Sequence, residues 1–156
     1  MKMTRRNCLS ALAMLTLGPW AQAQTGTVVE VWKDPNCGCC KDWIKHMEQA
    51  GFKTVVHDTG NNAARARLGL PMKFASCHTA LVQGYLLEGH VPASDVRKLL
   101  TQKPRALGLA VPGMPVGAPG MDGPEYGGRQ DRYEVLLVQR DGSSKVMNTY
   151  GKGVQQ

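Results

Sequence analysis

The chain has 156 residues, with 19 basic and 12 acidic side chains and 42% hydrophobic residues, a composition typical of one folded domain. Lysine and arginine are scattered without a run of five or more, which indicates a solvated surface and argues against nucleic-acid binding. Outside the amino-terminal segment, no apolar stretch is long enough to cross a bilayer.

Residues 1–23 have the features of an export signal. Cations precede a short apolar stretch, residues 9–17, and residues 21–23 supply the small side chains of a cleavage site. We therefore expect a periplasmic protein, exported by the Sec route or, because Arg5 and Arg6 resemble a twin-arginine signal, by the Tat route. Cleavage would leave a single domain, residues 24–156, with a net charge of +4 and no membrane anchor.

The first third of this domain predicts a βαβ unit. β-Branched and aromatic residues over 27–32 predict a strand that ends before Pro35. Apolar residues then recur at intervals of three and four, the pattern of one helix face: Cys40, Trp43, Ile44, Met47 and Ala50. Residues 53–57 predict a second strand, and this order of elements makes a parallel pair.

The following elements complete a thioredoxin-like order. A short helix is expected over residues 61–68, then a hairpin of residues 79–83 and 85–87, then a helix between Pro92 and Pro104. Strand, helix, strand, hairpin and helix is the order of a thioredoxin-like core. We therefore expect an α/β fold with a βαβ-ββα core.

A long stretch of glycine, proline and methionine follows this core. Residues 104–129 show no periodicity, which predicts a linker or a functional loop. Residues 133–139 and 145–150 are expected to form a second hairpin, with its turn at Asp141-Gly142, near the end of the chain. The loop therefore lies inside the domain.

Four cysteines remain after the predicted signal: Cys37, Cys39, Cys40 and Cys77. An even number in an exported chain suggests two disulfides, but a bridge between the adjacent Cys39 and Cys40 would distort the peptide. Cys37 and Cys40 have the CxxC spacing at a predicted helix start, where the positive dipole end favours thiolates. Cys77 lies before the strand whose entrance faces the CxxC turn in thioredoxin-like folds.

This grouping of sulfurs predicts a metal site. Thiolates packed together repel one another, so a reduced cluster needs protons or a cation. Zinc and an iron–sulfur centre both accept four thiolates. Met114 and Met121 in the predicted loop favour Cu(I), because thioethers select it over zinc and iron, although methionine also serves as a gap-filler in cores. His57, His78 and His90 are further candidate ligands, and each also suits a structural role.

Four motifs in this order resemble the CopG-type periplasmic copper-resistance family: "DPNCGCCKDW", "SCHTA", "YLLEGHVPASDVRKLL" and "GLAVPGMPVGAPGM". The resemblance runs from about residue 29 to residue 150. It implies a thioredoxin-like fold and a cysteine-bridged multinuclear copper cluster with a redox role. It places the ligands at Cys37, Cys39, Cys40, Cys77, Met114 and Met121.

The leading hypothesis is an exported protein that holds Cu(I) and lowers free copper or passes it to a periplasmic carrier. Cycling of the same sulfurs with an electron donor would make it a copper-linked oxidoreductase, and the residues leave open whether it turns over. The alternative is a thiol–disulfide oxidoreductase in which Cys37 attacks and Cys40 resolves. A small scaffold held by ordinary disulfides is the third hypothesis.

Overall fold

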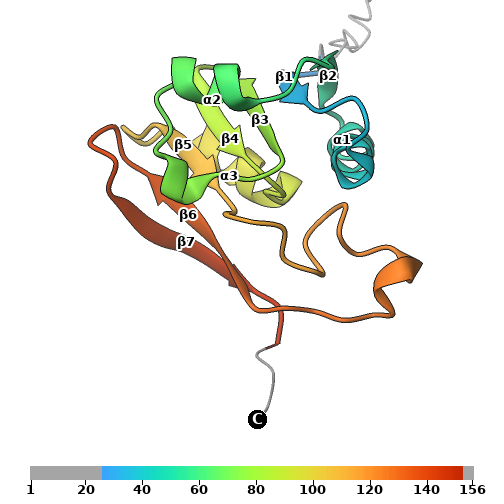
Figure 1. Ribbon diagram of the computed structural model, residues 1–156. Coiled ribbons are helices and arrows are strands. Elements are labelled where there is room, and N and C mark those ends of the chain that lie inside the picture. Colours follow the sequence, from blue (N-terminus) through green and yellow to red (C-terminus); the bar gives the residue numbers. More distant parts are fainter. Residues whose placement is uncertain (1–25, 153–156) are drawn as a thin grey trace, which may run out of the picture.

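One seven-stranded sheet carries the fold of residues 26–152, the part of the chain that this computed structural model describes (Figure 1). Together with three helices it makes a mixed α/β fold. The sheet has the order β2-β1-β3-β4-β5-β6-β7, with the strands β1 (Val28–Lys33), β2 (Lys53–His57), β3 (His78–Val82), β4 (Tyr85–Glu88), β5 (Gly108–Ala110), β6 (Tyr133–Val138) and β7 (Ser144–Tyr150). The predicted export signal lies outside the described residues.

The βαβ unit predicted from the sequence is confirmed. β1 pairs with β2 in parallel, and α1 (Gly38–Gln49) connects them. The helix buries the predicted face, Cys40, Trp43, Ile44 and Met47, because these positions share one side of a helix with 3.6 residues per turn. The cysteine turn is thus anchored between a buried strand and a buried helix face.

The predicted hairpin is also present, and it continues the sheet beside β1. β3 runs antiparallel to both β1 and β4. The two residues between β3 and β4, Gln83 and Gly84, both have positive φ, as a tight two-residue hairpin turn requires. Because Lys33 is paired with His78, the end of β1 and the start of β3 lie at the same end of the sheet.

The prediction of an irregular stretch over residues 104–129 is wrong at one point. Residues 108–110 form β5, which pairs in parallel with β4 and antiparallel with β6. At Gly108 a Cβ would collide with the Leu86 backbone, so the strands pair closely only because this residue has no side chain. Three residues are too few to show a period, so the sequence does not reveal this strand. Its pairing with β4 and β6 defines it.

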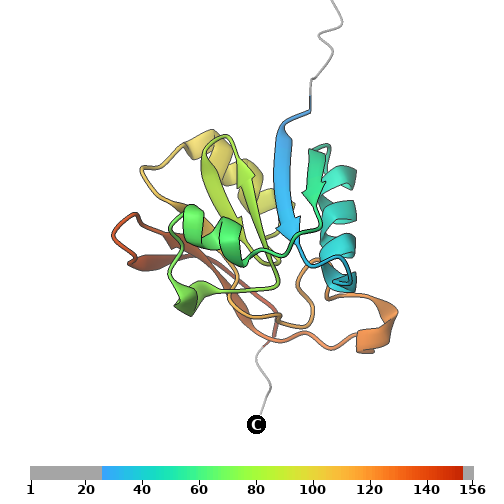
Figure 2. The ribbon, with the colours of Figure 1, turned by 45° about the horizontal axis from the view of Figure 1, so that its top comes forward.

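The helices cover both faces of the sheet (Figure 2). α1 and α3 (Ala93–Gln102) contribute to the larger core cluster, with Trp43, Met47, Val96 and Leu99 among its members. A smaller cluster on the other face gathers residues around the short helix α2 (Asn62–Arg67) and the turn η1 (Met72–Phe74), including Leu70 and Phe74. Among the described residues, no helix has the length and apolar character needed to cross a membrane.

Candidate metal centre

The cysteine turn is formed by local contacts at the amino terminus of α1. Cys37 is the N-cap residue, and its N–H donates to the Asp34 carbonyl at 3.1 Å. The Asp34 carboxylate accepts the N–H of Asn36 at 2.8 Å. Because the first N–H groups of a helix lack partners within it, this end carries a partial positive charge beside the three sulfurs.

The four cysteines predicted as ligands come together. Cys37 and Cys40 form a disulfide, whereas Cys39 and Cys77 are free. The Cys39 Sγ lies 3.6 Å from the Cys37 Sγ and 3.9 Å from the Cys77 Sγ. All four Sγ atoms lie within 4.8 Å of one another, although Cys77 is separated from Cys39 by 38 positions in the chain.

The disulfide settles a choice that the sequence had left open. The adjacency of Cys39 and Cys40 disfavours a bridge between them but selects no other pair. The structure contains one disulfide among its described residues, between the two ends of the CxxC spacing, with a Cα–Cα distance of 5.4 Å. It therefore contains two free thiols beside one bridge, where an ordinary scaffold would contain two bridges.

Two histidines stand beside Cys77. The Cys77 Sγ lies 3.1 Å from His90 Nε2 and 3.4 Å from His78 Nδ1. His90 donates from Nδ1 to the Pro119 carbonyl at 2.8 Å, so the neutral ring keeps a lone pair on Nε2, which faces the sulfur. Burial lowers the pKa of both histidines, and the neutral form is the one that coordinates metals.

His57 does not belong to this cluster. It stacks on Trp32 with ring centroids 5.2 Å apart, and its Nε2 lies 2.8 Å from Glu30 Oε1. Its contacts are those of a structural residue between β1 and β2. Of the three histidines considered from the sequence, only His78 and His90 reach the cysteines.

Burial controls the protonation of Cys77. Burial, with a smaller contribution from the charge of Cys39, raises the pKa of the Cys77 thiol to about 12. Cys77 is therefore a neutral thiol at neutral pH in the absence of a metal. A metal ion bound at this sulfur would release its proton.

Trp43 closes the inner side of the cluster. Its ring is fully buried, lies 4.3 Å from the His78 ring between centroids, and donates from Nε1 to the Val91 carbonyl at 2.9 Å. The ring therefore packs against His78 on the inner side of the cluster. His78 Nε2 is buried and has no hydrogen-bond partner among the described residues.

The two loop methionines have different environments. Met121 is 8% exposed, and its Sδ accepts the Tyr126 hydroxyl at 3.3 Å. The preceding Gly120 packs against the first turn of α1, since a Cβ there would lie 2.6 Å from the Cys39 carbonyl oxygen. Met114 is 55% exposed. Ligation by either methionine stays a prediction.

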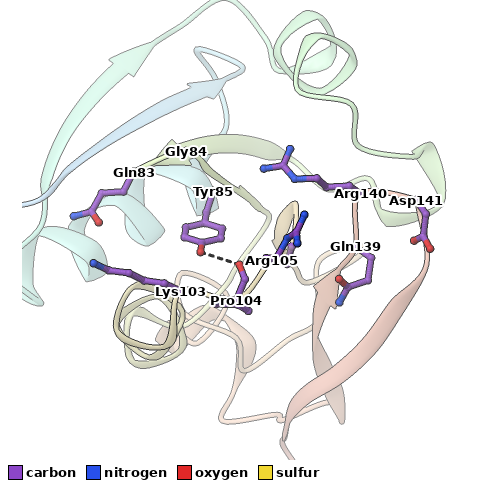
Figure 3. A pocket seen from close by; sticks show the side chains of 10 residues that line it. Gln83, Gly84, Tyr85, Lys103, Pro104, Arg105, Gln139, Arg140 and Asp141 are labelled. Atoms are coloured by element: carbon purple, nitrogen blue, oxygen red, sulfur yellow. Dashed lines mark hydrogen bonds between the residues drawn. The ribbon is translucent and has the colours of Figure 1, made fainter.

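An open groove away from the cysteines is a separate feature of the molecule (Figure 3). It has a volume of about 920 Å³ and lies at the turn between β3 and β4, the opposite end of this hairpin from Cys77. Its lining includes Lys103, Arg105 and Arg140, and the Tyr85 hydroxyl donates to the Pro104 carbonyl at 2.9 Å. Because no cysteine lines this groove, the candidate metal site is the cluster of four cysteines.

Sequence reasoning missed two charged residues beside the cluster. Arg65 and Glu88 form a buried ion pair, with 2.8 Å between Arg65 Nε and Glu88 Oε1, next to the backbone that leads into Cys77. The available signal was a glutamate at the end of the otherwise apolar strand of residues 85–88, because a carboxylate inside a sheet requires buried partners.

Comparisons with known proteins agree with these observations. The model of a family described as "Protein of unknown function, DUF411" matches residues 74–121, which include Cys77, Met114 and Met121. The comparison with curated proteins gave no match.

Two solved structures are similar to the chain over most of its length. One is described as copper resistance protein CopG, form 1, with 46% identity, a TM-score of 0.75, and coverage of 81% of this chain and 99% of that chain. The other is form 2 of the same protein, with 46% identity, a TM-score of 0.73, and coverage of 80% and 98%. At this identity and coverage, the chain belongs to the CopG family.

Proposed function

We propose that the chain is a periplasmic copper-binding protein that holds Cu(I) on Cys37, Cys39, Cys40 and Cys77 and acts in copper resistance. The observation that carries the proposal is the meeting of four sulfurs from two distant segments within 4.8 Å. The description of the similar structures as copper resistance proteins supports copper as the metal. The sequence signal over residues 1–23 supports export.

The donor set suits Cu(I) in more than one copy. Sulfurs at 3.6 and 3.9 Å from one another are close enough to bridge neighbouring ions, which favours a multinuclear, cysteine-bridged cluster. The His90 lone pair and the thioethers of Met121 and Met114 would complete the coordination of ions at the edge of the cluster. Cu(I) would also neutralise the mutual repulsion of the thiolates.

The disulfide adds a redox step to this proposal. Reduction of the Cys37–Cys40 bridge takes two electrons and produces two thiolates, so the reduced protein offers four sulfur ligands and the oxidised one offers two. A periplasmic electron donor would supply these electrons, and a copper carrier would deliver or receive the metal. Copper loading and the redox state of the bridge would then depend on each other.

The arrangement of the first four strands supports a thioredoxin-like relationship for the core. The sheet order β2-β1-β3-β4 contains the parallel pair and the hairpin expected from the sequence, and β3 also runs antiparallel to β1. The CxxC turn lies between β1 and α1, where such a core places its redox-active cysteines. We propose that β5, β6 and β7 extend this core.

Anaerobic reconstitution of the reduced mature protein with Cu(I), in the presence of competing zinc, tests the metal. The proposal expects more than one copper per chain, bound in preference to zinc, by metal analysis after removal of free ions. A single zinc ion that copper does not displace would contradict it.

The second candidate function is thiol–disulfide exchange, in which Cys37 attacks and Cys40 resolves. The disulfide at a helix amino terminus favours it, as does the burial of Cys40 beside a partly exposed Cys37. Under this hypothesis Cys37→Ser abolishes reduction of a test disulfide, whereas Cys39→Ser and Met114→Leu have little effect. Equal losses of copper in Cys39→Ser and Cys37→Ser would instead favour the metal site.

A further inference from the structure

The backbone that carries Cys77 is not held by the sheet. β3 begins at His78, and the pairing of β1 with β3 ends at the Lys33–His78 pair. Cys77 therefore lies one residue before the hydrogen-bonded ladder. The backbone on the other side of Cys77, toward Ser76, must be held by contacts other than strand pairing.

Buried charged side chains bind both polar backbone groups of the preceding residue, Ser76. Glu88 Oε1 accepts the Ser76 N–H at 2.7 Å, and Arg65 Nη2 donates to the Ser76 carbonyl at 2.6 Å. Arg65 Nε and Glu88 Oε1 are 2.8 Å apart, which closes a ring of three hydrogen bonds. The two side chains are 4% and 0% exposed.

Further hydrogen bonds orient this ion pair. Glu88 Oε2 accepts the Thr79 hydroxyl at 2.6 Å, and Asn62 Oδ1 accepts Arg65 Nη1 at 2.9 Å. Asn61 adds a second donor to the Ser76 carbonyl at 3.2 Å. Residues in and next to α2 and at the end of β4 thus converge on the backbone of one residue, Ser76, and Thr79 of β3 occupies the second oxygen of the Glu88 carboxylate.

The cost of burying two charges points to a geometric role. A buried ion pair is often no more stabilising than apolar side chains of the same volume, because both ions lose their hydration. Here each charge binds the backbone next to a sulfur that lies 3.9 Å from Cys39. Metal ligands must be held within about 0.5 Å of their productive positions, which loop residues rarely achieve without such support.

We propose that Arg65 and Glu88 are positioning residues that clamp the Ser76 peptide and thereby hold the Cys77 sulfur against the cysteine turn. The effect on copper rests on the proposed function. The effect on the distance between the Cys39 and Cys77 sulfurs is independent of the proposed function. The clamp would set how tightly the last thiolate joins the cluster, without itself touching the metal.

Arg65→Lys is the primary test, because it keeps the buried positive charge beside Glu88 but cannot donate at the same time to the Ser76 carbonyl and to Asn62. Dibromobimane, which becomes strongly fluorescent once it has alkylated two neighbouring thiols, reports the approach of Cys39 to Cys77 without any metal. Cu(I) affinity is measured in parallel by competition with a chelator.

The matched control is Asp95→Asn in α3. Asp95 is also a buried carboxylate, and it accepts the Tyr150 hydroxyl at 2.7 Å and Asn148 Nδ2 at 3.2 Å, but it has no contact with Ser76. Asp95→Asn likewise weakens the hydrogen bonds of a buried charged side chain, but at a site that does not hydrogen-bond to Ser76. Circular dichroism and thermal unfolding identify the folded variants.

The proposal expects folded Arg65→Lys to cross-link more slowly than the wild type and to bind Cu(I) about 10- to 100-fold more weakly, the loss typical of residues that orient metal ligands. Asp95→Asn should cross-link at the wild-type rate. If Arg65→Lys does not fold, Asn61→Ala, which removes one donor to the Ser76 carbonyl, should slow cross-linking to a smaller extent. Wild-type rates in folded Arg65→Lys or in Asn61→Ala would overturn the clamp. Slower cross-linking in a protein whose wild type binds no copper would uphold the clamp and reject the proposed function.

Discussion

The cysteine turn, residues 37–40, and the approach to Cys77 supply sulfurs to one cluster but are built in different ways. In the turn, three sulfurs lie within four positions, and the contacts that shape it come from Asp34 and the helix itself. The approach to Cys77 depends on Arg65 and Glu88, which are 11 and 12 positions from Ser76. A short motif can thus supply most ligands of a centre, while distant residues decide whether the last ligand reaches it.

The loop of residues 117–121, like the approach to Cys77, reaches the cluster through contacts between distant parts of the chain. Gly117 N–H donates to the Met121 carbonyl at 2.7 Å, and the N–H of Met121 donates to the Ala118 carbonyl at 2.7 Å. Through Gly120 and the Pro119 carbonyl, this loop contacts both α1 and His90. Damage to the loop should therefore affect the cluster even though all four cysteines remain.

Removal of single sulfurs should give the largest effect. We expect Cys39→Ser and Cys77→Ser each to weaken Cu(I) binding by about 100-fold or more, since loss of a ligand exceeds the loss caused by its orienting neighbours. Metal analysis after anaerobic loading measures the result. Met47→Leu, which changes a buried sulfur on the core side of α1, is the control. Full copper content in Cys77→Ser would show that the approach to Cys77 has no part in the centre.

Gly120→Ala should separate the loop from the turn. The added Cβ would lie 2.6 Å from the Cys39 carbonyl oxygen and 2.7 Å from the Trp43 backbone nitrogen. Overpacking of this kind costs about 1–3 kcal/mol. The control is Gly113→Ala, which has a similar positive φ but no atom within 4 Å of the added Cβ. Denaturant unfolding should show a greater loss of stability for Gly120→Ala, and equal losses would mean that backbone strain alone matters.

The pH dependence of Cys77 alkylation should report the burial of its thiol. Burial raises its pKa to about 12, and the thiolate is the reactive form. Below that pKa, alkylation of Cys77 in the metal-free protein should accelerate about tenfold per pH unit and show no plateau between about pH 7 and about pH 10. Mass spectrometry of labelled peptides measures the rate at this site. A plateau below about pH 9 would mean that the thiol is less buried than the structure indicates.

Replacement of the loop methionines should give the smallest effect. Met121→Leu, which replaces a buried thioether, is expected to weaken Cu(I) binding by about tenfold, or about 1.4 kcal/mol. Met114→Leu should have less effect, because Met114 is 55% exposed. Competition with a Cu(I) chelator compares the two variants. The reverse order would place Met114 at the metal and Met121 in a packing role.

Prediction from sequence succeeded where the pattern was long and local. The period of three and four from Cys40 to Met47 predicted the buried face of α1, and two strand-like runs separated by Gly84 predicted the β3–β4 hairpin. It failed at β5, whose three residues form a strand only between β4 and β6. It also could not choose between His57, which packs on Trp32, and His90, which faces Cys77.

The sequence by itself determined the CxCC turn at a strand-to-helix junction, because spacing within four residues and a helix start are local properties. It also determined which residue types were available to bind a soft metal. The expected order of elements also pointed to Cys77, but only the tertiary structure decided that His78 and His90 lie beside it and that Arg65 and Glu88 hold the backbone before Cys77. The physical reason is that these contacts join segments far apart in the chain, and they form only after the sheet and its two hydrophobic clusters bring those segments together.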